Sequence, residues 1–146
     1  MNSIFFTTPN AFLRGTLRVA ADKSISHRSL IFSALADGES TIQNLLLGAD
    51  VLRTLTILSQ LGVSMSHTAQ NLKSGDCLTV QGVGLHGFKK PPGELYCGNS
   101  GTTLRLMLGL LAGKSFESVL TGDEYLDKRP MERVLEPLRK MGAEFN

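Results

Sequence analysis

Residues 21–29 read ADKSISHRS, which places two cations, three hydroxyls and an imidazole within nine positions. Apolar residues at helical spacing follow at once, at Leu30, Ile31, Ala34 and Leu35. The polar residues therefore fall in a loop and the first turn of a helix, where free backbone N–H groups and the helix dipole favour bound anions. Lys23 and Arg28 add full positive charges, so the stretch indicates a phosphate or carboxylate site.

Two other interpretations of this stretch have to be weighed. Nucleotide-binding phosphate loops also carry a Lys-Ser pair before a helix, but they need Gly-x-x-x-x-Gly ahead of the lysine. Residues 18–22 are RVAAD and hold no glycine, which excludes that loop. An ordinary helix capped by Ser24 or Ser26, with Lys23 and Arg28 merely solvated, stays open on the residue types alone.

The composition is typical of a soluble globular protein and argues against several classes. The 146 residues suffice for one domain with a core, and 42% of them are hydrophobic. A net charge of +2 is too small and scattered to indicate nucleic-acid binding. The longest apolar run, 106–112, is far shorter than a membrane span, and the N-terminus lacks the pattern of a signal peptide. Cys77 and Cys97 show no zinc spacing and suit a reducing cytoplasm.

Hydrophobic periodicity, with glycine and proline as boundary signals, predicts alternating strands and helices. Strands are expected at 4–6, 16–20, 39–44, 63–68, 77–81 and 115–120. Helices are expected at 26–36, at 50–61 with Asp50 as the cap, at 102–112 and from 129 to 141. Residues 82–93 form a joint rich in glycine and proline, and 122–128 form a charged loop. Pro130 suits the first turn of the last helix, whereas Pro137 is expected to kink or restart it.

This order of elements repeats along the chain. Gly38 and Gly62 in the first half correspond to Gly113 and Gly142 in the second, with shifts of 75 and 80 residues. We predict a complete βαβαββ unit at 21–90, after a lead-in at 1–20, and a truncated second unit at 91–146. Repeats that bury their faces against neighbours need further copies, so the sequence is expected to be a piece of a larger protein.

The repeat gives the first polar stretch a counterpart at 99–102, NSGT, where a glycine at a helix start lets a ligand approach the backbone. A plain Ser/Thr-capped helix is the alternative there. Arg129, in the segment DKRP at 127–130, suits bidentate capture of a carboxylate or phosphate, although alone it reads as a solvated charge. If the units pack side by side, these loops share one face, which suits a substrate with more than one anionic group.

Arg105 is a further candidate, because it lies one turn into an otherwise apolar helix. A buried guanidinium needs a partner, so Arg105 either belongs to an ion pair or points at the ligand cleft. The structural ion pair is the favoured interpretation.

Three segments together resemble a known family: DKSISHR at 22–28, GNSGT at 98–102 and DKRPM at 127–131. In this order and spacing they resemble the signatures of the 5-enolpyruvylshikimate-3-phosphate synthase family, over essentially the whole chain. The related enolpyruvyl transferase acting on UDP-N-acetylglucosamine is the alternative, but its first motif resembles Gly-x-Lys-Asn instead. Ala21 and Ser100 depart from the family pattern, where many members have glycine and alanine, and neither departure removes a charge.

The resemblance implies an α/β fold of two lobes, each made of three βαβαββ units with helices inside and mixed sheets outside. Here that fold is incomplete, and residues 1–20 are expected to belong with the absent second lobe. The implied reaction transfers the enolpyruvyl group of phosphoenolpyruvate to the 5-hydroxyl of shikimate 3-phosphate, releasing phosphate. It implies no metal or organic cofactor, and small-molecule partners only: no nucleic acid and no membrane. A cytoplasmic enzyme that is a monomer at full length is expected.

The resemblance also implies roles for particular residues. Lys23 corresponds to the catalytic lysine that contacts both substrates. The implied contacts of shikimate 3-phosphate are Lys23, Ser24, Arg28 and Thr102, and those of phosphoenolpyruvate are Lys23, Asn99, Gly101 and Arg129. Glycine at 101 further implies a pocket open to the herbicide glyphosate. The acid–base carboxylates of the family fall beyond Asn146, so this chain alone is expected to be inactive. An inert substrate-binding fragment is the alternative interpretation.

Overall fold

The computed structural model describes residue 12 and residues 14–146. Helices and strands alternate along the chain, as the periodicity predicts, and the first unit has the order αβαββ. Their bounds are α1 Lys23–Leu35, β1 Asp37–Gln43, α2 Ala49–Gln60, β2 Ser64–Met65, β3 Cys77–Val83, β4 Leu95–Tyr96, α3 Gly101–Leu111, β5 Leu120–Thr121, α4 Glu124–Asp127 and α5 Glu132–Lys140.

The strands form two small sheets. In the first, the order is β1-β3-β2 and all pairing is antiparallel, with Asp37 opposite Val83 at one end of the β1–β3 ladder. In the second, β4 and β5 pair in parallel, with Leu95 opposite Leu120. The result is a mixed α/β architecture with incomplete units, which confirms the expected fold class.

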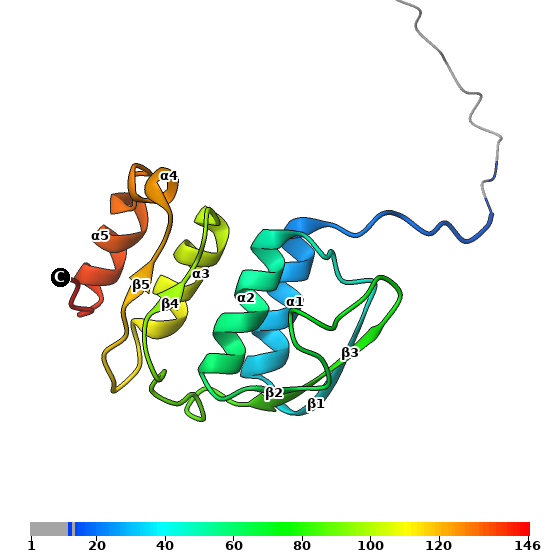
Figure 1. Ribbon diagram of the computed structural model, residues 1–146, viewed down its shortest axis with the longest axis horizontal. Coiled ribbons are helices and arrows are strands. Elements are labelled where there is room, and N and C mark those ends of the chain that lie inside the picture. Colours follow the sequence, from blue (N-terminus) through cyan, green and yellow to red (C-terminus); the bar gives the residue numbers. More distant parts are fainter. Residues whose placement is uncertain (1–11, 13) are drawn as a thin grey trace, which may run out of the picture.

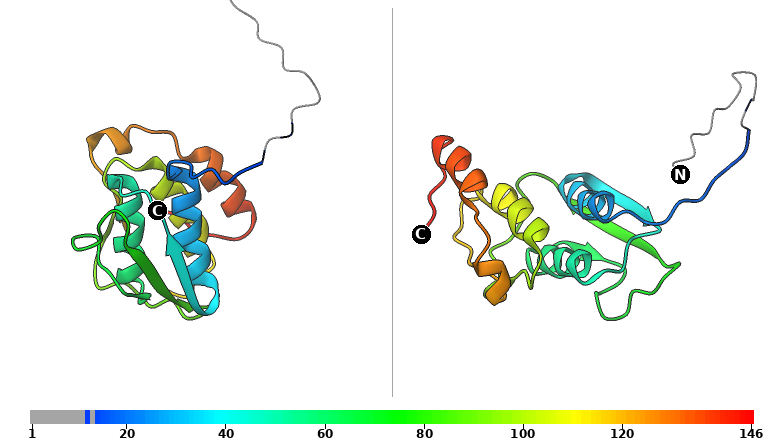
Figure 2. Two further views of the ribbon diagram at one scale, coloured as in Figure 1. Left: turned by 90° about the vertical axis from the view of Figure 1, so that its right-hand side faces the viewer. Right: turned by 90° about the horizontal axis from the view of Figure 1, so that it is seen from above.

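The helices lie in a row, in which α1 contacts α2, α2 contacts α3, and α3 contacts α5. Figure 1 shows that α1, α2, α3 and α5 all start at the same end of the molecule, so their axes run in parallel. The view from above in Figure 2 shows the same row, with β1 and β3 beside α1 and α2. This common direction is what positions the candidate site.

One hydrophobic core joins the elements of both halves. Fully buried side chains come from α1, α2, β3, β4 and α3: Leu30, Leu58, Leu78, Leu95 and Met107. Burying a leucine contributes about 1.5–3 kcal/mol, so this shared core holds the two sheets and their helices together. The division of the chain at residue 90 stays a prediction. No helix of the described residues is both long and apolar enough to cross a membrane.

The start of the first unit differs from the prediction. Residues 16–20 are not a strand, and Leu17 and Val19 stand exposed because no described strand pairs with them. The expected strand at 4–6 lies outside the described residues. Helix α1 begins at Lys23 rather than Ser26, because the carboxylate of Asp22 caps it by accepting the N–H of Ile25 at 2.7 Å. The alternative interpretation with a serine cap at 24 or 26 is therefore wrong about the cap.

The second unit also departs from the expected bounds. The charged loop at 122–128 holds the short helix α4, which Asp123 caps, and the final helix begins only at Glu132. Arg129 and Pro130 thus lie in the connection between α4 and α5, and Pro137 does not interrupt α5. The strand expected at 115–120 shrinks to β5, and its partner β4 was not predicted.

We expect Leu58→Ala to lower the free energy of unfolding by about 2–5 kcal/mol, because it removes a completely buried side chain from the shared core. Urea unfolding followed by circular dichroism measures the change. Leu85→Ala is the matched control: Leu85 is 64% exposed and should cost about 0.5 kcal/mol or less. Equal losses in the two variants would contradict the core described above.

Candidate anion site at the helix N-termini

The parallel helices bring their positive ends together at one end of the molecule (Figure 1). Each N-terminus carries free N–H groups and the equivalent of about half a positive charge. The predicted site residues sit at these starts: Lys23 and Ser24 in the first turn of α1, Gly101 and Thr102 in that of α3, and Arg129 shortly before α5. Such an end of a molecule favours bound anions.

Lys23 is held by a carboxylate from the next helix. Its ammonium donates to Oδ2 of Asp50, and both side chains are partly exposed. The predicted capping role of Asp50 is wrong, because Gly48 is the N-cap of α2 and Asp50 lies in the first turn. An exposed ion pair of this kind contributes about 1 kcal/mol or less, so it is a weak contact.

The start of α3 is fastened to the start of α2. The hydroxyl of Thr103 donates to the backbone carbonyl of Asp50 at 3.1 Å and lies 2.8 Å from Oγ of Ser100. Ser100 is the N-cap of α3 and accepts the N–H of Thr103 at 3.1 Å. The alternative interpretation of this segment is thus correct in one respect: a serine caps the helix. Through Thr103, the start of α3 is thus linked to Asp50, the residue that pairs with Lys23.

Two guanidinium groups flank Gly101. A Cβ built at this position would lie 2.9 Å from Nη1 of Arg105 and 3.0 Å from Nη1 of Arg129. Arg129 also donates to Oδ1 of Asn99, so Asn99, Gly101 and Arg129 form one cluster. Because glycine has no side chain, both cations can reach the backbone at the start of α3.

Arg105 has no carboxylate partner among the described residues, so the favoured structural ion pair is wrong there. It donates only to the backbone carbonyl of Pro130, at 3.4 Å, and its Nε has no partner within the described part of the chain. Desolvation, then the charges of Arg133 and Arg129, lowers the pKa of the Arg105 guanidinium. Positive charge therefore accumulates around Gly101 without a balancing acid from the described residues.

Ser24 and Arg28 lie on a different stripe of α1. They are four residues apart, share one side of the helix and are both exposed. Lys23 and His27, also four apart, face α2 instead, since they contact Asp50 and Thr54. The described contacts join Lys23 to Asp50 and Gly101 to Arg129 as two separate groups, and one face shared by Lys23, Arg28 and Arg129 stays a prediction. The described residues do not bring the side chains of Ser24, Arg28 and half-buried Thr102 into hydrogen-bonding contact with either group.

His27 is an unexpected part of the interior. The imidazole is fully buried, and its Nδ1 lies 2.8 Å from the hydroxyl of Thr54. Burial, with a smaller contribution from Lys23 that Asp50 partly opposes, lowers the pKa of His27 below its ordinary value of 6.5. The side chain is therefore neutral at pH 7. Nothing in the local sequence reveals this, because the burial comes from α2, a separate segment.

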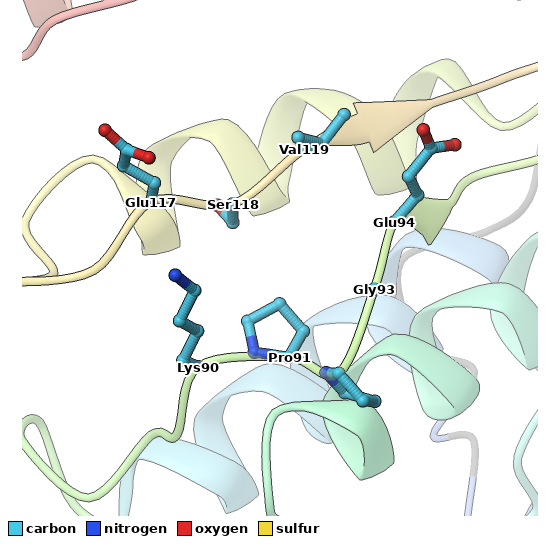
Figure 3. A pocket seen from close by; sticks show the side chains of 8 residues that line it. Lys90, Pro91, Gly93, Glu94, Glu117, Ser118 and Val119 are labelled. Atoms are coloured by element: carbon cyan, nitrogen blue, oxygen red, sulfur yellow. The ribbon is translucent and has the colours of Figure 1, made fainter.

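An open groove of about 310 Å³ lies at the other end of β4 and β5 (Figure 3). Its walls are residues 90–94, which precede β4, and 117–119, which precede β5, whereas α3 begins beyond the far end of β4. The groove thus takes no part in the anion site. The described residues also hold no group of three or more His, Cys, Asp or Glu placed to bind a metal ion.

Fold and site together define an α/β protein with basic side chains at the N-terminal end of its helix row. A family model described as EPSP synthase (3-phosphoshikimate 1-carboxyvinyltransferase) matches residues 7–146. A protein of Alkalilimnicola ehrlichii with the latter name is 52% identical over 95% of this chain, and one of Pelobacter propionicus is 49% identical over 98%. The solved EPSP synthase of Acinetobacter baumannii superposes with a TM-score of 0.80 at 48% identity, over 89% of this chain and 28% of its own.

The chain therefore belongs to the EPSP synthase family. It spans about 30% of the length of the curated relatives that it matches. This confirms the resemblance read from the three motifs, including the expectation that the chain matches only part of the family's length.

We expect acid to destabilise the fold partly through His27. The unfolded chain takes up a proton on this imidazole near pH 6.5, whereas the buried imidazole stays neutral, so the free energy of unfolding falls as the pH drops below 6.5 toward the lowered pKa. Urea unfolding at a series of pH values down to about pH 5 measures the slope. His27→Asn should lack this part of the slope and the exposed-site control His86→Asn should keep it; identical slopes would contradict the assignment.

Proposed function

We propose that the whole protein transfers the enolpyruvyl group of phosphoenolpyruvate to the 5-hydroxyl of shikimate 3-phosphate and releases phosphate. Membership of the EPSP synthase family supports this proposal. The observation that carries it is the convergence of Lys23, Gly101 and Arg129, from three separate segments, on the cationic end of the helix row. Both substrates are polyanions, and such an end is suited to bind them.

Lys23 is the proposed contact shared by the two substrates and the catalytic residue of this chain. It lies between the starts of α1 and α2, and a substrate phosphate or carboxylate replaces Asp50 on its ammonium. Arg129 offers the fork of its guanidinium to phosphoenolpyruvate, with Gly101 and Asn99 lining the same pocket.

The proposed site for shikimate 3-phosphate lies along the exposed stripe of α1. Ser24 and Arg28 supply a hydroxyl and a cation on one side of that helix, and neither is engaged by another described side chain. Thr102, in the first turn of α3, is the third proposed contact. In this proposal the two substrates meet at Lys23, which precedes Ser24 in the chain and pairs with Asp50 in the first turn of α2.

In the proposed reaction, carbon 3 of the enol is protonated and the 5-hydroxyl adds to carbon 2. The tetrahedral adduct then loses phosphate and a proton from carbon 3, which restores the double bond. Lys23 and Arg129 stabilise the negative charge on the departing phosphate, because they are cations already held in place where that charge develops. We place the acid–base carboxylates outside these 146 residues.

The 146 residues by themselves are proposed to bind ligand without turnover, because they span about 30% of the length of their curated relatives. Calorimetry with shikimate 3-phosphate on this chain measures the binding, and phosphate release by the same chain would refute the proposal. For the whole protein we propose a cytoplasmic monomer without metal or organic cofactor, which sedimentation and metal analysis of the purified active protein would check.

Replacing Lys23 tests the function directly. The whole protein, given phosphoenolpyruvate and shikimate 3-phosphate together, should release phosphate, and Lys23→Ala should bind neither substrate measurably. Lys73→Ala is the control, since Lys73 is an exposed lysine in the turn before β3. Absence of phosphate release from the wild-type protein at saturating substrates would refute the function. Unchanged substrate affinity in Lys23→Ala would refute the role of that residue.

A methyl group at Gly101 should weaken phosphoenolpyruvate binding without unfolding the protein. The added Cβ would meet the ends of two flexible side chains, Arg105 and Arg129, which must move away. We expect the KM for phosphoenolpyruvate to rise about tenfold, which corresponds to about 1.4 kcal/mol. Gly109→Ala on the same helix is the control, because nothing lies within 4 Å of a Cβ there. Equal kinetics in both variants would contradict the assignment of the arginine cluster.

A further inference from the structure

A chain of buried polar side chains runs through the middle of the helix row. Nδ1 of His27 lies 2.8 Å from the hydroxyl of Thr54. The hydroxyl of Thr54 lies 2.9 Å from that of Thr103, and the hydroxyl of Thr103 lies 2.8 Å from that of Ser100. The four residues come from α1, α2, α3 and the N-cap of α3, and all four are fully buried. The described residues offer no partner to Nε2 of His27, so the chain ends there.

Hydrogen-bonding rules give this chain a direction. A buried N–H without a partner is rarer than a bare lone pair, which favours the tautomer with the proton on Nδ1 of His27. Nδ1 then donates to Thr54, and the hydroxyl of Thr54 in turn donates to Thr103. The proton of Thr103 goes on to the carbonyl of Asp50 or to Ser100, which also accepts the N–H of Thr103.

The two ends of this hydrogen-bonded series lie close in sequence to the two groups of candidate site residues. His27 lies one turn beyond Lys23 on the side of α1 that faces α2, and Ser100 immediately precedes Gly101. Thr103 also holds the backbone of Asp50, the residue that pairs with Lys23. The distance between Lys23 and the Gly101–Arg129 cluster is therefore set through Thr54 and Thr103.

We propose that Thr54 and Thr103 are positioning residues that hold the first turn of α3 against α1 and α2, and thereby fix the phosphoenolpyruvate pocket relative to Lys23. The substrate readout of this inference rests on the proposed function. Apolar side chains could bury the same area, but they would not fix the rotation of one helix against the next. Directional hydrogen bonds do so, and a fully satisfied polar network specifies one packing.

The test compares variants that differ by one hydroxyl. Thr54→Val keeps the shape of the side chain and removes the hydroxyl, whereas Thr54→Ser keeps it. Thr56→Val is the matched control, because Thr56 lies on the same helix and donates only to the carbonyl of Leu52 within that helix, at 2.9 Å.

In the whole protein, Thr54→Val should raise the KM for phosphoenolpyruvate at least fivefold and leave that for shikimate 3-phosphate within twofold. Thr54→Ser and Thr56→Val should stay within twofold of the wild type for both. A merely structural role would lower the folded fraction and hence the maximal rate, but would leave both KM values unchanged. An unchanged KM for phosphoenolpyruvate in Thr54→Val would overturn the proposal.

Amide hydrogen exchange gives a second readout that needs no enzymatic activity. The N–H of Thr103 donates to Ser100, and in Thr54→Val we expect it to exchange at least tenfold faster than in Thr56→Val. Equal rates would overturn the positioning role. If the wild-type protein releases no phosphate, the proposed function fails and the exchange rates alone decide this inference. If Thr54→Val does not fold, Thr103→Val replaces it, with Thr103→Ser as its control. The readouts are then the KM values for the two substrates and the exchange rate of the N–H of Leu104, which donates to the carbonyl of Ser100.

Discussion

The parallel alignment of α1, α2, α3 and α5 is the constraint on which the site depends. Four helix starts at one end place like partial charges side by side, which is unfavourable. Burial of the apolar helix faces outweighs this, since each leucine removed from water contributes about 1.5–3 kcal/mol and the shared core contains several. The positive end is therefore a consequence of packing the helices in parallel around the shared core.

The protein without ligand balances this charge unevenly. Asp50 pairs with Lys23, so the α1 side of the candidate site already contains a carboxylate partner for its lysine. Around Gly101, in contrast, Arg105 and Arg129 have only a backbone carbonyl and the amide oxygen of Asn99 as partners among the described residues. The two sides therefore differ. Lys23 has a carboxylate partner, whereas Arg105 and Arg129 have none among the described residues.

Local patterns were enough to predict most of the elements, because helix periodicity and terminal glycines act over a few residues. Helices α1, α2 and α3 were placed within three residues of their observed starts. The prediction of strands failed where pairing with another segment decides the structure. Residues 16–20 alternate but have no described partner, whereas the two residues of β4 form a strand because β5 lies alongside. A strand depends on a distant segment, and that information is not in its own sequence.

The sequence by itself determined the three polar segments, the charges that they carry and the family to which the chain belongs. Only the tertiary structure decided that Asp50 holds Lys23 and that His27 is a buried neutral imidazole. It also decided that Arg105 stands beside Arg129 rather than in an ion pair with a described residue. The physical reason is that charge pairing and burial depend on which helices pack together. The helices that pack together are far apart in the sequence, so local patterns do not reveal their contacts.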